Sequence, residues 1–131
     1  MLPSFSSQIT FLYFQDYQSS STFLDRVFGL EVVFDPGWAK VYRVCGPAFL
    51  GAVDASRGSV KDLPERKGVL ISLTVKDAGA WRSRLEPMGL EAMTEMTHFE
   101  DLGLQSFFFD GPEGYRFEIQ EFIDPQLRAL F

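Results

Sequence analysis

Three polar side chains alternate near the end of the chain and are the strongest candidates for chemistry. Arg116, Glu118 and Gln120 are spaced two residues apart, so on a β-strand all three lie on one face. Arg116 could bind an anionic ligand group, and Glu118 could act as a general base. The alternative is a structural ion pair between Arg116 and Glu118, because a nearby arginine makes a carboxylate a weaker base.

Aromatic residues on two other segments are candidates for ligand contacts. We expect Phe11 to form part of a cavity wall, next to Tyr13 on the same strand face. The Tyr13 hydroxyl could bind a ligand, or Tyr13 could be a core residue whose hydroxyl reaches solvent. Trp38 and Tyr42 share a face at period two, which suits an aromatic platform for a planar ligand. Ordinary sheet packing or a dimer contact is the alternative for this second pair.

The chain has one histidine and one cysteine. His98 is predicted to lie in a loop, where it is either an acid–base group at a cavity mouth or simply solvated. Cys45 ends a predicted strand, and we expect a buried, inert thiol. We find no Ser-His-Asp arrangement, phosphate loop or nucleotide motif. Glu118 and His98 are therefore the best catalytic candidates, although no catalytic role is assigned.

The elements that must position these side chains occur twice. Each copy begins with a strand that ends in an aspartate suited to cap a helix, and a glycine follows each helical stretch. The first copy comprises a strand at 8–15, a helix at 17–28 and strands at 30–34, 38–45 and 48–54. The second comprises a strand at 68–76, then a helix, then strands at 90–97, 104–110 and 115–121, with a loop at 98–103. The apolar stripe of that helix is Ala78, Trp81, Leu85 and Met88. A short helix is predicted from Asp124-Pro125.

This repeat predicts an α+β protein in which each sheet carries one helix. We expect one domain over residues 1–131, with modules at about 8–55 and 68–122 and a polar, solvated linker at 56–67. Two copies of one module tend to enclose a pocket. Fourteen phenylalanines exceed what a small core needs, so some are expected to line a cavity or an interface.

Three stretches give the chain a resemblance to a known family. They are 9–33, which ends in Phe28-Gly29-Leu30-Glu31-Val32-Val33, then 69–91, and finally 108–118 with the sequence FFDGPEGYRFE. Their order and spacing resemble the vicinal oxygen chelate superfamily of glyoxalase I, extradiol dioxygenases, and fosfomycin and bleomycin resistance proteins. The resemblance implies two βαβββ modules that form a curved mixed sheet around a central cavity.

The same resemblance implies where metal ligands would lie. Metal-using members place a ligand on the first strand of each module, and those positions here are Ile9 and Leu70. The last-strand ligand of the first module falls within 51–53, where no donor is present, although Asp54 is adjacent. The corresponding residue in the second module is Glu118, which does match. Since a dedicated site needs about three protein donors, we expect neither the usual metal nor another cofactor.

Composition excludes several classes of protein. The 131 residues are 46% hydrophobic and carry a net charge of −6, without a basic cluster for nucleic acid or a membrane surface. One cysteine excludes an intrachain disulfide and favours a reducing, cytoplasmic compartment. The first 14 residues lack a positive region, so we expect no signal peptide. Apolar runs stay well below the ~20 residues of a membrane helix.

The sequence therefore predicts a metal-free protein that binds a small apolar or aromatic molecule, of the glyoxalase/bleomycin resistance type. The alternative is a superfamily lyase, isomerase or dioxygenase, either metal-free or with relocated ligands such as Glu118, His98 and Asp54. We also expect a homodimer, because Leu127, Leu130 and Phe131 would expose apolar surface at the C-terminus.

Overall fold

The computed structural model describes residues 2–65 and 67–131. Its contacts divide the chain into two compact units, Met1–Pro64 and Glu65–Phe131. Unit 1 contains β1 (Gln8–Phe14), α1 (Tyr17–Phe28), β2 (Glu31–Phe34), β3 (Ala39–Cys45) and β4 (Ala48–Asp54). Unit 2 contains β5 (Leu70–Thr74), α2 (Ala78–Leu85), β6 (Thr97–Phe99), β7 (Leu104–Asp110), β8 (Arg116–Phe122) and α3 (Pro125–Leu130). The enclosed cavity expected from the resemblance stays a prediction.

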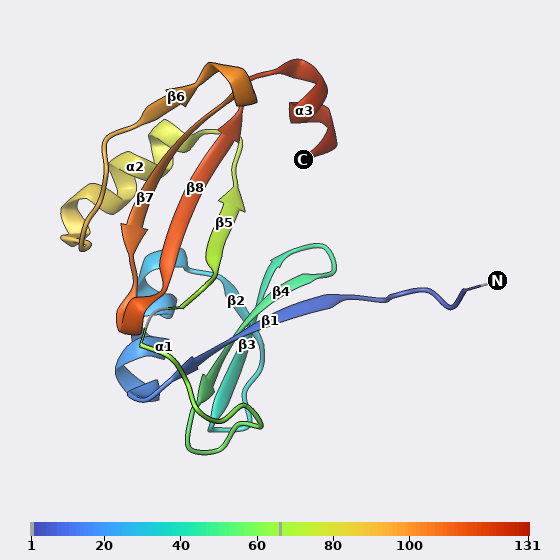
Figure 1. Cartoon of the computed structure of the whole chain (residues 1–131), viewed down its shortest axis with the longest axis vertical. Helices are drawn as coiled ribbons and strands as arrows, with labels where there is room; N and C mark the ends of the chain where they lie inside the picture. Colours follow the sequence, from blue (N-terminus) through green and yellow to red (C-terminus); the bar gives the residue numbers. More distant parts are fainter. Residues whose placement is uncertain (1, 66) are drawn as a thin grey trace. The chain divides into compact units, whose positions relative to one another are not determined.

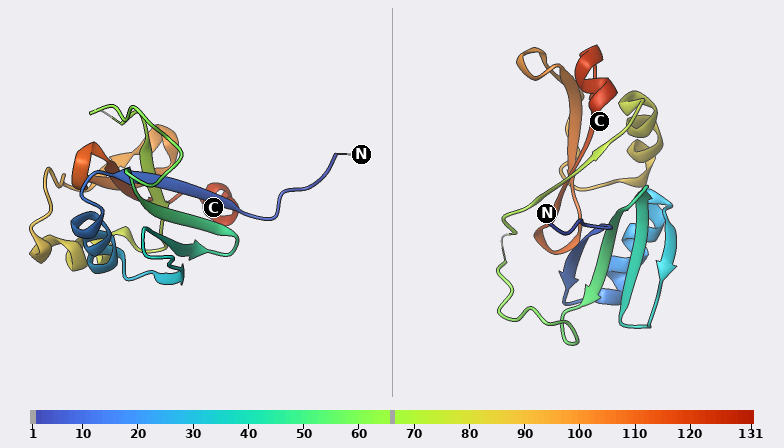
Figure 2. Two further views of the ribbon diagram at one scale, coloured as in Figure 1. Left: turned by 90° about the horizontal axis from the view of Figure 1, so that it is seen from below. Right: turned by 90° about the vertical axis from the view of Figure 1, so that its right-hand side faces the viewer.

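Each unit is built around one four-stranded mixed sheet (Figure 1). The strand order is β1-β4-β3-β2 in sheet A and β5-β8-β7-β6 in sheet B. The first strand of each module runs parallel to the last, and the remaining pairs are antiparallel. Helix α1 packs on sheet A and α2 on sheet B (Figure 2). The predicted α+β fold of two βαβββ modules is confirmed. Each sheet has one face covered by α1 or α2, and we call the opposite face helix-free, although in sheet B Phe131 at the end of α3 stacks on it, against Phe122.

The signals that start the helices are the same in both modules. Asp16 Oδ1 accepts a hydrogen bond of 3.1 Å from the Ser19 N–H, and Asp77 Oδ1 accepts one of 2.9 Å from the Ala80 N–H. Such caps satisfy amide groups that have no partner within the helix. Gly29 ends α1 with a φ of 60°, in the left-handed region that glycine adopts without strain. The predicted helix boundaries in unit 1 are confirmed.

The hydrophobic core lies between each sheet and its helix. In unit 1, Leu12 and Phe14 are 1% and 0% exposed and share their face of sheet A with Leu50 and Ala52. In unit 2, the Phe109 and Phe117 rings stack with their centroids 5.5 Å apart, and neither is exposed. Burial of such rings is worth several kcal/mol in each unit, on the order of 3–5 for a phenylalanine.

The segment from residue 90 to 103 differs from its prediction. A continuous strand was expected at 90–97, but the structure has only a bridge between Glu91 and Asp110 followed by β6. Ala92 has a φ of 52°, which interrupts extended backbone. The Thr94 hydroxyl then accepts a hydrogen bond of 2.9 Å from the Phe108 N–H, where a regular ladder would use a carbonyl. The predicted loop at 98–103 is likewise wrong, since it holds most of β6 and a 3-10 turn at Glu100–Leu102.

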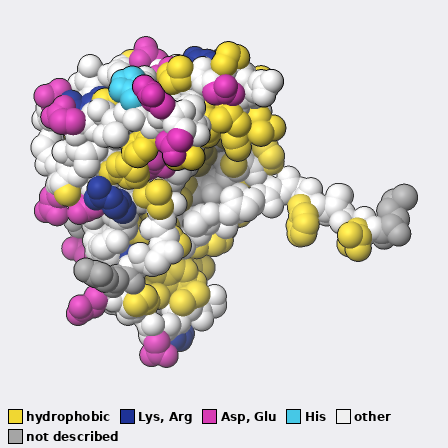
Figure 3. All heavy atoms as spheres, turned by 45° about the horizontal axis from the view of Figure 1, so that its top comes forward, with side chains coloured by type: hydrophobic (Ala, Val, Ile, Leu, Met, Phe, Trp, Pro, Cys, Tyr) yellow, Lys and Arg dark blue, Asp and Glu magenta, His cyan; other side chains and the backbone are white. Residues whose placement is uncertain are grey.

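An extended arm precedes β1 and projects away from sheet A (Figure 3). Leu2 and Phe5 on this arm are 90% and 99% exposed. None of the helices formed by residues 2–65 and 67–131 is long and apolar enough to cross a membrane.

Candidate functional site

The helix-free face of sheet B brings the three alternating polar residues together. In the strand register, Arg116, Glu118 and Gln120 of β8 lie opposite Leu70, Ser72 and Thr74 of β5. On the other side they lie opposite Asp110, Phe108 and Ser106 of β7. Because residues that are opposite in a sheet share a face, these nine residues form one continuous surface, which we call the polar face.

Arg116 forms an ion pair with Asp110 and not with Glu118. Its Nη1 lies 2.6 Å from Asp110 Oδ1, directly across the β7–β8 pair. Its guanidinium also lies over the Phe108 ring, 5.2 Å from the centroid. The predicted structural pair of Arg116 with Glu118 is therefore wrong. Asp110 lies directly across the β7–β8 pair from Arg116, and its carboxylate forms the ion pair instead.

Glu118 is buried on the polar face. Its exposed fraction is 9%, and the Ser72 hydroxyl donates a hydrogen bond of 2.8 Å to its Oε1. Among the residues that the structure describes, Ser72 is the one side chain that pairs with it, and no cation does. A carboxylate in this environment has unused acceptor capacity.

Two further residues on this face, Thr74 and Ser106, were not singled out by the sequence. Gln120 Nε2 donates to Thr74 Oγ1 at 3.0 Å. Ser106, opposite Gln120, is fully buried, and its hydroxyl has no hydrogen-bond partner among the described residues. Because Ser106 alternates with Phe108 and Asp110 along β7, the sequence could have placed it on this face. It could not have shown that the Ser106 hydroxyl lacks a hydrogen-bond partner among the described residues.

The other catalytic candidate, His98, lies on the opposite face of sheet B. It pairs with Gln105, which in turn pairs with Glu121. That row belongs to the helix-covered side, because Glu121 Oε1 accepts a hydrogen bond of 2.9 Å from the Ala78 N–H at the start of α2. His98 and Glu118 therefore cannot act on the same group within unit 2.

Glu121 is a densely bonded carboxylate that sequence reasoning missed. Besides the Ala78 amide, it accepts hydrogen bonds of 3.1 Å from Gln105 Nε2 and from Arg128 Nη1. Partial burial raises its pKa, but the hydrogen bonds from Ala78, Gln105 and Arg128 outweigh that effect and leave the pKa lowered. Arg128 also donates to the carbonyls of Phe122 and Lys76, so this cluster holds α3 in place.

The helix-free face of sheet A is apolar. Ile9 and Phe11 are 40% and 45% exposed. Phe11 lies opposite Gly51, and a Cβ added to Gly51 would collide with the Phe11 ring. The ring thus covers the backbone of β4 at a position where metal-using relatives are expected to carry a donor.

Tyr13 continues this apolar face and holds the linker. Its hydroxyl accepts hydrogen bonds of 3.1 Å from the Ser59 N–H and 3.3 Å from the Val60 N–H. Hydrogen bonding with the Ser59 hydroxyl is the main reason that the pKa of Tyr13 is lowered. The ring lies against Gly58. The linker, predicted to be simply solvated, is therefore partly docked on unit 1.

The Trp38 and Tyr42 rings do not form a shared platform. Tyr42 is 1% exposed, and its hydroxyl donates a hydrogen bond of 2.7 Å to Asp25 on α1. Burial, with Asp25 nearby, raises the pKa of Tyr42 strongly. Trp38 remains 36% exposed, with the Arg57 guanidinium 5.7 Å from its ring centroid. For Tyr42 the structure supports the alternative of ordinary packing.

The residues at the family's metal positions do not fit a metal. Ile9 and Leu70 offer no donor atom. Asp54 shares the helix-covered face with Phe14, and hydrogen bonds from Ser56 lower its pKa. Within residues 2–65 and 67–131, no three His, Cys, Asp or Glu side chains are grouped so as to hold an ion. Glu118 is left as a single carboxylate, short of the donors a site requires.

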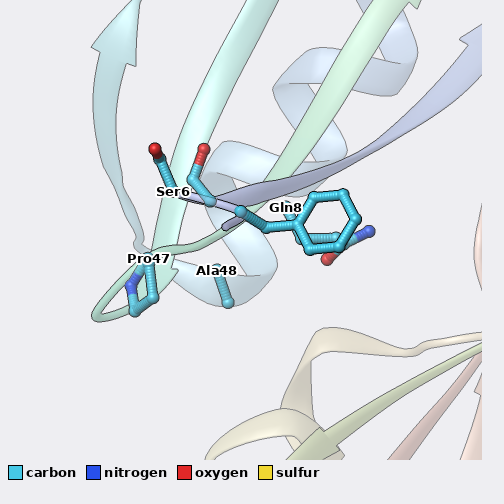
Figure 4. Close-up of a pocket in the computed structure, with 6 residues that line it drawn as sticks. Ser6, Gln8, Pro47 and Ala48 are labelled. Atoms are coloured by element: carbon cyan, nitrogen blue, oxygen red, sulfur yellow. The ribbon is translucent and has the colours of Figure 1, made fainter. Parts of the chain in front are cut away.

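Cys45 is exposed at the end of β3, so the expected burial of its thiol is wrong. The strand ends there at the β3–β4 turn, where no element covers it. Nearby, where the arm leaves sheet A, a shallow hollow of about 450 Å³ is lined by Phe5, Ser6, Ser7, Gln8, Pro47 and Ala48 (Figure 4). None of the predicted site residues lines this hollow, and no charged side chain does.

Known structures share this fold across almost the whole chain. A lactoylglutathione lyase from Agrobacterium tumefaciens is 24% identical, with a TM-score of 0.67 over 92% of this chain and 96% of that one. A mutant of the fosfomycin resistance protein FosX from Listeria monocytogenes, solved with Mn(II) and dihydroxypropylphosphonic acid, is 18% identical, with a TM-score of 0.69 over 98% and 99%. The bleomycin resistance determinant of transposon Tn5 is 14% identical, with a TM-score of 0.68 over 88% and 97%.

At these identities the likeness establishes the fold alone. No curated protein matches the sequence. A family model does match, over residues 7–119, and it describes the Glyoxalase/Bleomycin resistance protein/Dioxygenase superfamily. That match spans both modules, from the arm to the middle of β8. The chain therefore belongs to the Glyoxalase/Bleomycin resistance protein/Dioxygenase superfamily.

Proposed function

We propose that this chain is a small-molecule binding protein that works without the superfamily's usual metal. Its ligand is an apolar or aromatic molecule that is bound rather than converted. The supporting observation is the lack of donor atoms at the positions where the family places metal ligands. Ile9 and Leu70 are aliphatic and 40% and 49% exposed, and the Phe11 ring covers Gly51. Exposed apolar side chains on a sheet face suit apolar ligands.

Each unit, taken by itself, offers candidate contact residues on the helix-free face of its own sheet. Phe11 supplies apolar surface in unit 1. Glu118 and Gln120 supply hydrogen-bonding groups in unit 2. Tyr13 and Arg116 play a smaller part than the sequence predicted, because the hydroxyl of Tyr13 holds the linker and Arg116 is paired with Asp110.

The second candidate is a superfamily enzyme, a lyase, isomerase or dioxygenase. One observation favours it: Glu118 remains at a family metal position and has unused acceptor capacity. Two neighbours of similar fold carry enzyme or resistance names, lactoylglutathione lyase and FosX. A relocated set of Glu118, His98 and Asp54 is disfavoured, because His98 and Asp54 lie on helix-covered faces.

Elemental analysis of protein purified without chelator separates the two candidates. We expect less than about one-tenth of an equivalent of zinc, nickel, manganese or iron per chain, because one carboxylate does not retain these ions. One equivalent of any of them, lost in Glu118→Ala but kept in Glu95→Ala, would overturn the binding-protein proposal. Glu95 is a suitable control because its side chain is 91% exposed.

A cytoplasmic homodimer completes the proposal. Its support is the exposed apolar surface of Leu130 and Phe131, 71% and 68% exposed on α3, together with an exposed thiol at Cys45 that persists in a reducing compartment. Light scattering at micromolar concentration should give twice the mass of the chain. A mass equal to 14.9 kDa would refute the dimer.

A further inference from the structure

We infer that the polar face of sheet B binds an organic cation, with Glu118 as the counter-charge. The ligand class is an ammonium or amidinium group carried on an apolar or aromatic body. This inference rests on the proposed binding function and narrows it, because an apolar ligand alone would leave the most buried carboxylate of the chain unused.

The charges on the polar face do not balance. It carries three charged residues: Arg116, Asp110 and Glu118. Arg116 and Asp110 neutralise each other across the ladder at 2.6 Å. Glu118 remains, so the face has a net charge of about −1 that a bound cation would compensate.

Burial makes this imbalance significant. Glu118 is only 9% exposed, and a single serine hydroxyl donates to it. A carboxylate removed from water needs a charged or multiply hydrogen-bonding partner, and one neutral hydroxyl is a weak substitute. By contrast, Glu121 on the other side of β8 has an amide, a glutamine and an arginine as partners. The shortage of partners is therefore specific to the helix-free face.

The neighbours of Glu118 suit a cation with an apolar body. Phe108 lies directly opposite it on β7. The Arg116 guanidinium already lies over this ring, so Phe108 offers apolar contact to the body of the ligand. Ser106, one pair further along the ladder, has a buried hydroxyl without a partner among the described residues. An ammonium group has three donors and no acceptor, so it can use both a carboxylate and a hydroxyl oxygen.

An anionic ligand is disfavoured on the same grounds. The one cation on the polar face, Arg116, already binds Asp110 and lies over Phe108. An anion would have to displace Asp110 from Arg116, and its repulsion by the Glu118 carboxylate would not be offset by another cation on the polar face. A metal ion is disfavoured because Glu118 and Ser72 provide too few donors.

Three naphthalene probes of nearly equal shape test the inference by isothermal titration calorimetry: naphthylmethylammonium, naphthylmethanol and naphthoate. We expect the ammonium probe to bind at least about tenfold more tightly than the alcohol, with naphthoate weakest. Glu118→Gln keeps the side chain's shape and its acceptor for Ser72 but removes the charge, so it should abolish this preference. Glu95→Gln makes the same change in net charge at an exposed position and should leave it intact.

The outcomes separate this inference from the proposed function. Equal binding of ammonium and alcohol overturns the cation inference alone, as does a preference that survives Glu118→Gln. If none of the three probes binds at millimolar concentration, both proposals fail. The wild-type comparison needs no variant, so it decides the question even if Glu118→Gln does not fold.

Discussion

The helix-free faces of the two sheets differ far more than their helix-covered faces. Each helix-covered face holds a core of apolar side chains, such as Phe14 in unit 1 and Phe117 in unit 2, both unexposed. On the helix-free side, sheet A presents Ile9 and Phe11 to solvent. Sheet B presents a hydrogen-bonded row that includes a buried carboxylate.

This difference shows which part of a repeated module the fold constrains. The helix side must keep close packing between sheet and helix, so its residues can change only within narrow limits of size and polarity. The helix-free side has no such partner within its own module, and its residues can adapt to a ligand. On this side sheet A presents apolar contact area, and sheet B presents hydrogen-bonding groups and a charge.

The largest expected effect comes from Glu121, the carboxylate on the helix-covered side of β8. Glu121→Gln removes a charge that meets Arg128 and the Ala78 amide, so we expect a loss of about 1–3 kcal/mol in the free energy of unfolding at neutral pH. Urea denaturation measures it. An unchanged midpoint would mean that the bonds of Glu121 contribute nothing to the stability of unit 2.

The same variant should also change how the free energy of unfolding depends on pH. The pKa of Glu121 is lowered in the folded chain from an ordinary value of 4.5. Its stabilisation is therefore fully present above about pH 5 and is lost as the pH falls through the folded pKa. The free energy of unfolding of Glu121→Gln should vary less with pH over that acidic range than that of the wild type. Glu95→Gln, at an exposed position, should keep the wild-type slope.

Much of the fold was predictable because it rests on local signals. Asp16 and Asp77 are capping residues ahead of apolar helical stripes, and the helix at 17–28 and the strands at 48–54 and 104–110 have the predicted bounds. The segment at 90–97 was not predictable in the same way. A strand was predicted there from the order of elements in the repeat, but the positive φ of Ala92 and the side-chain hydrogen bond of Thr94 are not encoded in that order.

The candidate site was predictable in position but less so in its pairings. Alternation alone places Arg116, Glu118 and Gln120 on one face. Which acid pairs with Arg116 depends on the register of β7, and that register puts Asp110 opposite it. The side of the sheet that holds His98 also depends on register, because it is the pairing of His98 with Gln105 that fixes its face.

A change at Glu118 is expected to affect the free energy of unfolding in the opposite direction to Glu121→Gln. Glu118→Leu replaces a buried carboxylate that has a single hydroxyl partner, so we expect the free energy of unfolding to rise by about 1–2 kcal/mol. The measurement is the same urea titration, made on both variants in parallel. A loss comparable to that of Glu121→Gln would show that Glu118 is a structural residue, and the contrast between the two faces of β8 would disappear.

The smallest effect concerns the apolar face of sheet A. Gly51→Ala introduces a methyl group that collides with the Phe11 ring. Since that ring is 45% exposed, it can swing outward, and we expect a loss of only about 1 kcal/mol. Gly68→Ala is the matched control, because nothing lies within 4 Å of a Cβ there. If the apolar face of sheet A binds apolar ligands, Gly51→Ala should weaken the binding of naphthylmethanol, and Gly68→Ala should not, because only the first change displaces the Phe11 ring. Equal affinities of the two variants for naphthylmethanol would contradict a role for Phe11 in binding.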